Sequence, residues 1–152
     1  MNPRPFVTLL ATGILATGML GCTPSTSDRD LRPVTASEGV ALAAGKPGSA
    51  FKAATKGVWV DPRRAETYAE GHIPGAMSLP FGSGDFESQA EERLAGFDPI
   101  IVYGDDYQDI LANAASKRLI ELGFKSVYTL RGGIQQWIAD GYEVDGGGED
   151  AE

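Results

Sequence analysis

The chain has 152 residues, 42% of them hydrophobic, which is enough for one domain with a sizeable core. Its formal net charge is −8 and no Lys/Arg cluster is available to neutralise phosphates, which argues against nucleic acid as a partner. With one cysteine and one histidine, the chain can form neither an intrachain disulfide nor a zinc site of the usual Cys/His type. We therefore expect no metal and no cofactor.

The first residues have the features of an export signal. Residues 6–20 carry no charge, a stretch too short for a membrane span of about 20 residues but suited to the apolar region of a secretory signal. The "MLGC" at residues 19–22 resembles the lipobox of bacterial lipoproteins, in which the cysteine, here Cys22, is acylated and becomes the mature N-terminus. The alternative is an ordinary signal peptide with an incidental cysteine.

This resemblance divides the chain into four parts. It implies a lipoprotein signal peptide over residues 1–21 and attachment to membrane lipid through acylated Cys22. The small polar residues that follow predict a flexible tether over 22–32, and a folded domain is expected over 33–145. The acidic, glycine-rich residues 146–152 predict a disordered tail. The domain would then lie in the periplasm or at the cell surface of a bacterium.

The first half of the domain begins with a short extended piece and a helix that is capped by Thr35 or Ser37 and ended by Gly45. A strand is expected at 56–61. A short helix should begin near Pro62 and end at Gly71, before an extended segment at 72–80.

The second half continues with a polar helix at 86–94 and a strand at 100–103. A longer helix is expected from Ile110 to Gly123, then a strand at 126–130 and a short helix after 132–133. The strands are apolar on both faces and alternate with helices, which predicts a parallel sheet covered on two sides.

Three motifs in order resemble those of the rhodanese-like domain family. They are Asp-x-Arg at a strand end, Gly-His-Ile-Pro-Gly-Ala at 71–76, and Leu-Arg-Gly-Gly followed by a tryptophan at 130–137. The resemblance spans about residues 33–142. It implies an α/β fold with a central parallel sheet of about five strands, flanked by helices on both faces. The resemblance implies a structural role for the motif residues, which are Asp61, Arg63, Gly71, His72, Gly132, Gly133 and Trp137.

The turn "GDDYQD" at 104–109 departs from the family pattern. Such strand-to-helix turns are where ligands gather in α/β folds, and active members carry a cysteine directly after the strand-end tyrosine. Here that position is Gly104, which cannot carry the sulfur that a thiolate passes on as a persulfide. The resemblance therefore implies no catalytic residue and a vestigial active-site loop, which consists of Gly104, Asp105, Asp106, Tyr107, Gln108, Asp109 and Ile110.

The three aspartates of this loop leave several interpretations open. In the first, they are solvated acids at a helix N-terminus, with Asp109 as the N-cap. In the second, they are ligands of a divalent cation, and in the third they face a basic patch on a protein partner. An aspartate nucleophile for phosphoryl transfer is the remaining option, with Arg131 as the nearest candidate cation. Repulsion between like charges predicts that removal of Asp105 has little effect or stabilises the fold.

The remaining polar motif residues have both a functional and a structural interpretation. His72 is either a general base or metal ligand, or a ring bonded to nearby backbone, and the structural role is favoured. Asp61 and Arg63 are likewise better explained as a local ion pair than as substrate groups. We expect a membrane-tethered, noncatalytic module that interacts with an envelope protein. The alternatives are an enzyme that uses the acidic loop and a residual sulfurtransferase-related role.

Overall fold

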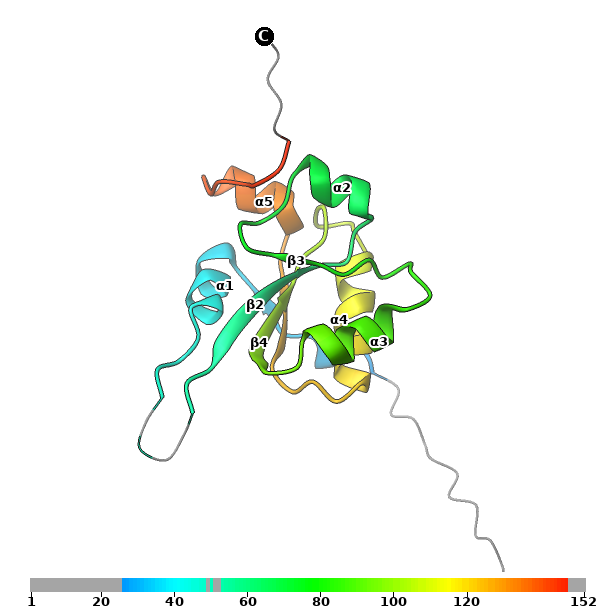
Figure 1. The fold of residues 1–152 in the computed structure, drawn as a ribbon. Helices are drawn as coiled ribbons and strands as arrows, with labels where there is room; N and C mark the ends of the chain where they lie inside the picture. Colours follow the sequence, from blue (N-terminus) through cyan, green and yellow to red (C-terminus); the bar gives the residue numbers. More distant parts are fainter. Residues whose placement is uncertain (1–25, 49, 51–52, 148–152) are drawn as a thin grey trace, which may run out of the picture.

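The computed structural model describes residues 26–48, 50 and 53–147 (Figure 1). The predicted signal peptide, Cys22 and most of the predicted acidic tail lie outside these residues. A 3-10 turn, η1 (Asp28–Asp30), precedes ten further elements. They are β1 (Pro33–Val34), α1 (Ala36–Ala43), β2 (Lys56–Asp61), α2 (Ala65–Glu70), β3 (Met77–Ser78), α3 (Phe86–Arg93), β4 (Phe97–Val102), α4 (Leu111–Glu121), β5 (Val127–Leu130) and α5 (Gly133–Ala139).

The five strands form one sheet in the order β1-β5-β4-β2-β3, and all four pairings are parallel. This confirms the predicted α/β fold with a five-stranded parallel sheet between helices. Helices α3 and α4 cover one face of the sheet, and α1, α2 and α5 lie on the other (Figure 1).

Alternate residues of the central strands supply the two cores. In β4, Ile100 and Val102 face α3 and α4, while Ile101 faces the opposite layer. In β2, Val60 likewise faces α3 and α4, while Trp59 faces the opposite layer. Because successive side chains of a strand point to opposite faces, a strand buried on both sides must be apolar throughout. The continuous apolar runs in the sequence therefore correspond to the middle of the sheet.

Two helix starts differ from the predicted ones. Helix α2 begins at Ala65 rather than near Pro62, because the backbone is still extended at Arg64. Helix α4 begins at Leu111 with Ile110 as its N-cap, one residue later than predicted. At α1 the prediction is confirmed: Thr35 is the N-cap, and its side chain accepts a hydrogen bond from the Glu38 N–H.

Part of the predicted tether contacts the domain. The Lys117 ammonium lies 2.6 Å from the Asp28 carboxylate, and the Arg32 guanidinium donates to the carbonyl oxygen of Lys125 (3.3 Å). Residues 28 and 32 of the predicted tether thus lie against the domain. Small polar composition alone carries no information about a partner located more than eighty residues later in the chain. Among the described residues, no helix is long and apolar enough to cross a membrane.

Tyr103 directly follows β4 and is completely buried. Its hydroxyl oxygen accepts a hydrogen bond from the Ile73 N–H (3.2 Å), and the Arg63 guanidinium lies over its ring. Burial raises the pKa of Tyr103 well above its ordinary value, and the negative charge of Asp61 raises it further. The folded protein therefore strongly disfavours the phenolate form of this residue.

Replacing Tyr103 with Phe leaves the Ile73 N–H without its partner and should lower the free energy of unfolding by about 1–2 kcal/mol at pH 7. A tyrosine in the unfolded chain ionises near pH 10, whereas the folded-state pKa of Tyr103 is raised. Its contribution to stability is therefore complete below about pH 10 and is lost as the pH rises above that value. The difference in free energy of unfolding between wild type and Tyr103→Phe, measured by urea titration, should therefore become smaller above about pH 10. Tyr107→Phe serves as the exposed control, and a gap that is constant with pH would contradict the assignment.

Candidate functional site

The loop of residues 104–110 joins β4 to α4 at the carboxyl edge of the sheet. Its first two residues are anchored to the start of α5. The carbonyl oxygen of Gly104 accepts from the Ile134 N–H (2.9 Å), and that of Asp105 accepts from the Gln135 N–H (3.0 Å). These bonds place the loop against a second element whose own sequence, Gly132-Gly133, belongs to the predicted motif.

The two glycines are needed because the loop comes so close. Both have a positive φ, 75° for Gly132 and 57° for Gly133. A Cβ atom on Gly133 would lie 2.4 Å from the carbonyl oxygen of Gly104, and one on Gly132 would lie 2.6 Å from the ring of Tyr107. Only glycine combines this backbone conformation with this approach. The motif glycines therefore allow the loop to lie directly against the start of α5.

The Asp109 carboxylate occupies the space beside Gly104. Its Oδ2 accepts a hydrogen bond from the Asp105 N–H (2.9 Å), and its Oδ1 accepts one from the Leu111 N–H (2.7 Å). A Cβ atom at residue 104 would lie 2.1 Å from Oδ2. Asp109 thus accepts a hydrogen bond from the first N–H of α4, as predicted for a capping carboxylate, although the N-cap position itself is Ile110. The Asp109 carboxylate bridges the two ends of the loop, since one oxygen binds the Leu111 N–H and the other binds the Asp105 N–H.

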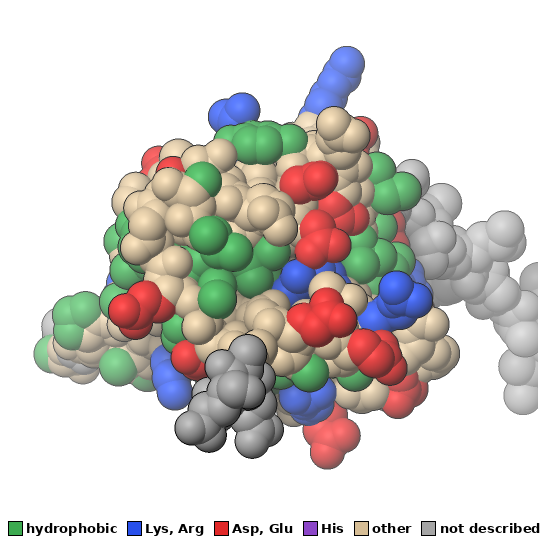
Figure 2. All heavy atoms as spheres, turned by 90° about the horizontal axis from the view of Figure 1, so that it is seen from above, with side chains coloured by type: hydrophobic (Ala, Val, Ile, Leu, Met, Phe, Trp, Pro, Cys, Tyr) green, Lys and Arg blue, Asp and Glu red, His purple; other side chains and the backbone are tan. Residues whose placement is uncertain are grey.

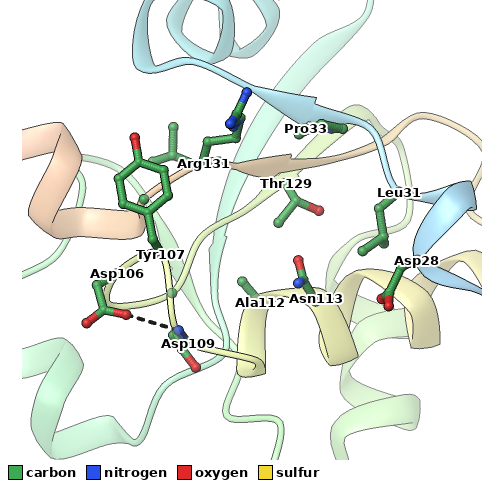
Figure 3. A pocket seen from close by; sticks show the side chains of 13 residues that line it. Asp28, Leu31, Pro33, Asp106, Tyr107, Asp109, Ala112, Asn113, Thr129 and Arg131 are labelled. Atoms are coloured by element: carbon green, nitrogen blue, oxygen red, sulfur yellow. Dashed lines mark hydrogen bonds between the residues drawn. The ribbon is translucent and has the colours of Figure 1, made fainter.

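The other loop side chains point elsewhere. Asp106 turns back on the loop, where its Oδ1 accepts from the N–H groups of Gln108 (2.7 Å) and Asp109 (3.0 Å). Tyr107 and Ile110 are 66% and 79% exposed, the largest values among the exposed large hydrophobic residues. Figure 3 shows the hydrogen bond between Asp106 and Asp109 and the ring of Tyr107 on the same side of the cavity.

Asp105 belongs to an ion network centred on Arg63. The Arg63 guanidinium donates to Asp61 (2.6 Å), to Asp105 (2.7 Å) and to the carbonyl oxygen of Gly71 (2.7 Å). The ion pair predicted between Asp61 and Arg63 is thus present. Burial lowers the pKa of Arg63, but its hydrogen bonds to Asp61 and Asp105 outweigh this and hold the pKa above its ordinary value.

This network corrects the interpretation of the loop charge. No cation occurs between residues 100 and 116, but Arg63 reaches Asp105 from a distant part of the sequence. Removal of Asp105 would leave a buried guanidinium with one carboxylate fewer, so the expected neutral or stabilising effect does not fit the structure. The three carboxylates have separate partners. Among the described residues, no group of three or more acidic or histidine side chains is arranged to hold a metal ion.

The remaining motif residues pack away from the loop. The Nδ1 atom of His72 lies 2.9 Å from the carbonyl oxygen of Tyr68, and its ring stacks on the Tyr68 ring with centroids 3.8 Å apart. The Trp137 indole N–H donates to the carbonyl oxygen of Glu143 (2.7 Å), and its ring packs edge-on against Trp59. These contacts fit the structural roles favoured for His72 and Trp137.

A cavity of about 290 Å³ lies between the loop, the ends of β1 and β5, and the first turns of α4. Figure 3 shows Tyr107 and Arg131 toward one end and Asp28 toward the other. Sequence reasoning missed the wall contributed by the N-terminal segment, since residues 22–32 were expected to be a free tether. The lining residues are Asp28, Leu31, Pro33, Gly104, Asp106, Tyr107, Asp109, Ala112, Asn113, Thr129, Leu130, Arg131 and Gly132.

The family model for the rhodanese-like domain matches residues 49–140. The chain belongs to this family.

Relatives and solved structures agree with this assignment. The rhodanese-like chain is 34% identical over 86 residues to an uncharacterized protein of Buchnera aphidicola, a match covering 56% of this chain and 58% of that protein. It is 32% identical over 83 residues to the thiosulfate sulfurtransferase GlpE of Coxiella burnetii, covering 54% of this chain and 72% of GlpE. The rhodanese-like domain of the Alr3790 protein from Anabaena sp. is 33% identical with a TM-score of 0.54, covering 60% and 82% of the two chains.

Within the rhodanese-like domain, the loop carboxylates should differ in their effects on stability. Asp109→Ala removes a half-buried acceptor from two N–H groups and should lower the free energy of unfolding by about 1–2 kcal/mol. Asp106→Ala also removes two backbone bonds, but at an exposed turn where water replaces the carboxylate, so the loss should be smaller. Chemical denaturation measures both. Equal losses would contradict the view that Asp109 holds the loop together.

Proposed function

We propose that this rhodanese-like domain does not transfer sulfur and serves as a binding module, held at a bacterial membrane by a lipid on Cys22. The observation that carries the proposal is the position of the Asp109 carboxylate, 2.1 Å from the point where a side chain at residue 104 would begin. The proposal has three parts, which concern the missing nucleophile, the exposed loop and the membrane anchor.

Sulfur transfer needs a thiolate to hold the persulfide. The chain has one cysteine, Cys22, and residue 104 at the start of the loop is glycine. Backbone N–H groups at a helix N-terminus stabilise an anion, which in an active domain would be the thiolate. Here the N–H groups of Asp105 and Leu111 already bind Asp109. The anion that these N–H groups bind is thus a carboxylate, which cannot form a persulfide.

The exposed part of the loop suits a protein partner. Tyr107 and Ile110 present apolar surface to solvent beside the carboxylates of Asp105 and Asp106. Figure 2 looks down on this end of the molecule and shows acidic side chains beside hydrophobic ones. Exposed apolar side chains that are rimmed by polar residues mark interaction surfaces. The partner we infer is an envelope protein with a basic, partly apolar patch.

A sulfurtransferase assay with thiosulfate tests the noncatalytic role. The wild-type protein should show no turnover, and Gly104→Cys alone should show little, because Asp109 blocks the new side chain and competes for its N–H groups. Residue 104 lacks a positive φ, so the backbone tolerates cysteine there. Gly104→Cys with Asp109→Ala frees both space and donors, and should raise turnover at least about tenfold over the single variant, the equivalent of roughly 1.4 kcal/mol.

The matched control is Gly104→Cys with Asp106→Ala, which removes an equal charge but leaves the carboxylate beside residue 104. Its activity should equal that of Gly104→Cys alone. Wild-type turnover above the enzyme-free blank would overturn the noncatalytic proposal. Full activity in the single cysteine variant would show instead that Asp109 does not obstruct the loop.

The membrane anchor is tested by mass spectrometry and fractionation. The mature protein should begin at Cys22 with acyl chains attached and should remain in the membrane fraction. Each buried CH₂ of an acyl chain contributes about 0.8 kcal/mol, so two or more chains hold a protein stably. Cys22→Ala should move the protein out of the membrane fraction. An unmodified thiol on a protein that fractionates without membrane would refute this part of the proposal.

A further inference from the structure

One edge of the sheet is only half covered. Strand β3 has two residues, and they are in register only with Val60 and Asp61 at the end of β2. The first part of β2, residues 56–59, has no register partner on this side among the described residues, whereas the preceding Thr55 pairs with Lys46. A groove of about 510 Å³ lies at this edge, and none of its lining residues belongs to the loop. It is lined by Lys56, Gly57, Val58, Tyr68, Gly75, Ala76, Met77, Ser78, Arg93 and Phe97.

The backbone of β2 directs hydrogen-bonding groups toward this groove. The carbonyl oxygen of Val60 accepts from the Tyr103 N–H after β4, whereas that of Asp61 accepts from the Leu79 N–H after β3. The pairing of β2 with β4 is irregular beside Gly57, but the extra residue lies in β4, between Phe97 and Ile100. Since peptide groups alternate along β2, the N–H and C=O of Gly57 point to the same side as those of Asp61. Gly57 lines the groove, so its peptide groups face the place that a longer β3 would occupy.

The groove is cationic in an acidic protein. Its lining includes Lys56 and Arg93 and no carboxylate, although the chain has 21 acidic and 13 basic residues. The Arg93 guanidinium donates to the carbonyl oxygen of Ser78 (2.9 Å) and to the Gln89 side chain (3.1 Å), both of them neutral groups. The Lys56 ammonium lies over the Phe97 ring. Neither cation forms an ion pair with another described residue.

We propose that this groove binds an extended, carboxylate-bearing segment of a partner protein, which adds to the sheet as a strand beside β2. Backbone hydrogen bonds to Gly57 would align the segment, and its carboxylates would lie near Lys56 and Arg93. Edge strands accept added strands in this way, with main-chain bonds giving affinity and side-chain contacts giving specificity. The site is separate from the loop and does not depend on the proposed function.

The test uses the whole chain and a fluorescent peptide in which glutamate alternates with valine. Anisotropy should show saturable binding, and Lys56→Glu and Arg93→Glu should each weaken it about threefold or more, as expected for loss of one contact between opposite charges. Lys125→Glu is the matched control, since Lys125 is exposed and does not line the groove. A peptide with lysine in place of glutamate should not bind. A peptide with central proline, which lacks one N–H, should bind more weakly.

Several results would overturn the proposal. They are no binding of the glutamate peptide, equal weakening by Lys125→Glu, and no effect of proline. Thermal unfolding of each variant identifies any loss of fold, and Lys56→Glu remains informative if Arg93→Glu destabilises β3. Light scattering tests for a second copy of this chain in the groove, and the anisotropy assay on a truncated chain tests for the acidic tail. A dimer that dissociates on Lys56→Glu would assign the groove to a second copy of this chain, and tighter peptide binding after deletion of residues 148–152 would assign it to the acidic tail.

Discussion

The Arg63 guanidinium joins three parts of the chain, of which the loop lies 42 residues away in sequence. It binds Asp61 at the end of β2, the carbonyl oxygen of Gly71 after α2, and Asp105 in the loop after β4. A buried guanidinium costs several kcal/mol unless its donors are satisfied, so these partners are required once Arg63 is inside. Their positions fix where α2 ends and where the loop begins. The geometry of the candidate site therefore depends on a side chain that does not line the cavity.

The loop follows from this anchor. Asp105 is held by Arg63 through its side chain and by α5 through its carbonyl oxygen. Its N–H then points to the space beside Gly104, together with the N–H of Leu111 at the start of α4. Two convergent N–H groups at a helix N-terminus favour an anion, and Asp109 supplies one from within the loop. The Asp109 carboxylate satisfies both donors, which explains how the loop stays folded with glycine at residue 104.

The sheet was predictable from sequence because its signals are local. Apolar runs such as Ile100–Val102 and the glycines that end helices depend on neighbours within a few residues. The site was less predictable because its contacts are distant. The bond from Arg63 to Asp105 spans 42 residues. The Asp109 bonds span only 2 and 4 residues, yet three acids in one loop left the choice among them open until the backbone was known. The Asp-x-Arg motif held one clue: a buried guanidinium has more donors than a single carboxylate can accept.

The uneven distribution of charge gives this small acidic domain two surfaces of different local charge. The net charge of −8 would by itself repel any anionic partner. Exposed charges are screened beyond about 8 Å at physiological ionic strength, however, so a segment in the groove is affected mainly by Lys56 and Arg93. At the loop, Asp105 is partly neutralised by Arg63, while Asp106 bonds only backbone N–H groups of its own turn. Local pairing, rather than total charge, therefore sets the sign of the charge that each surface presents.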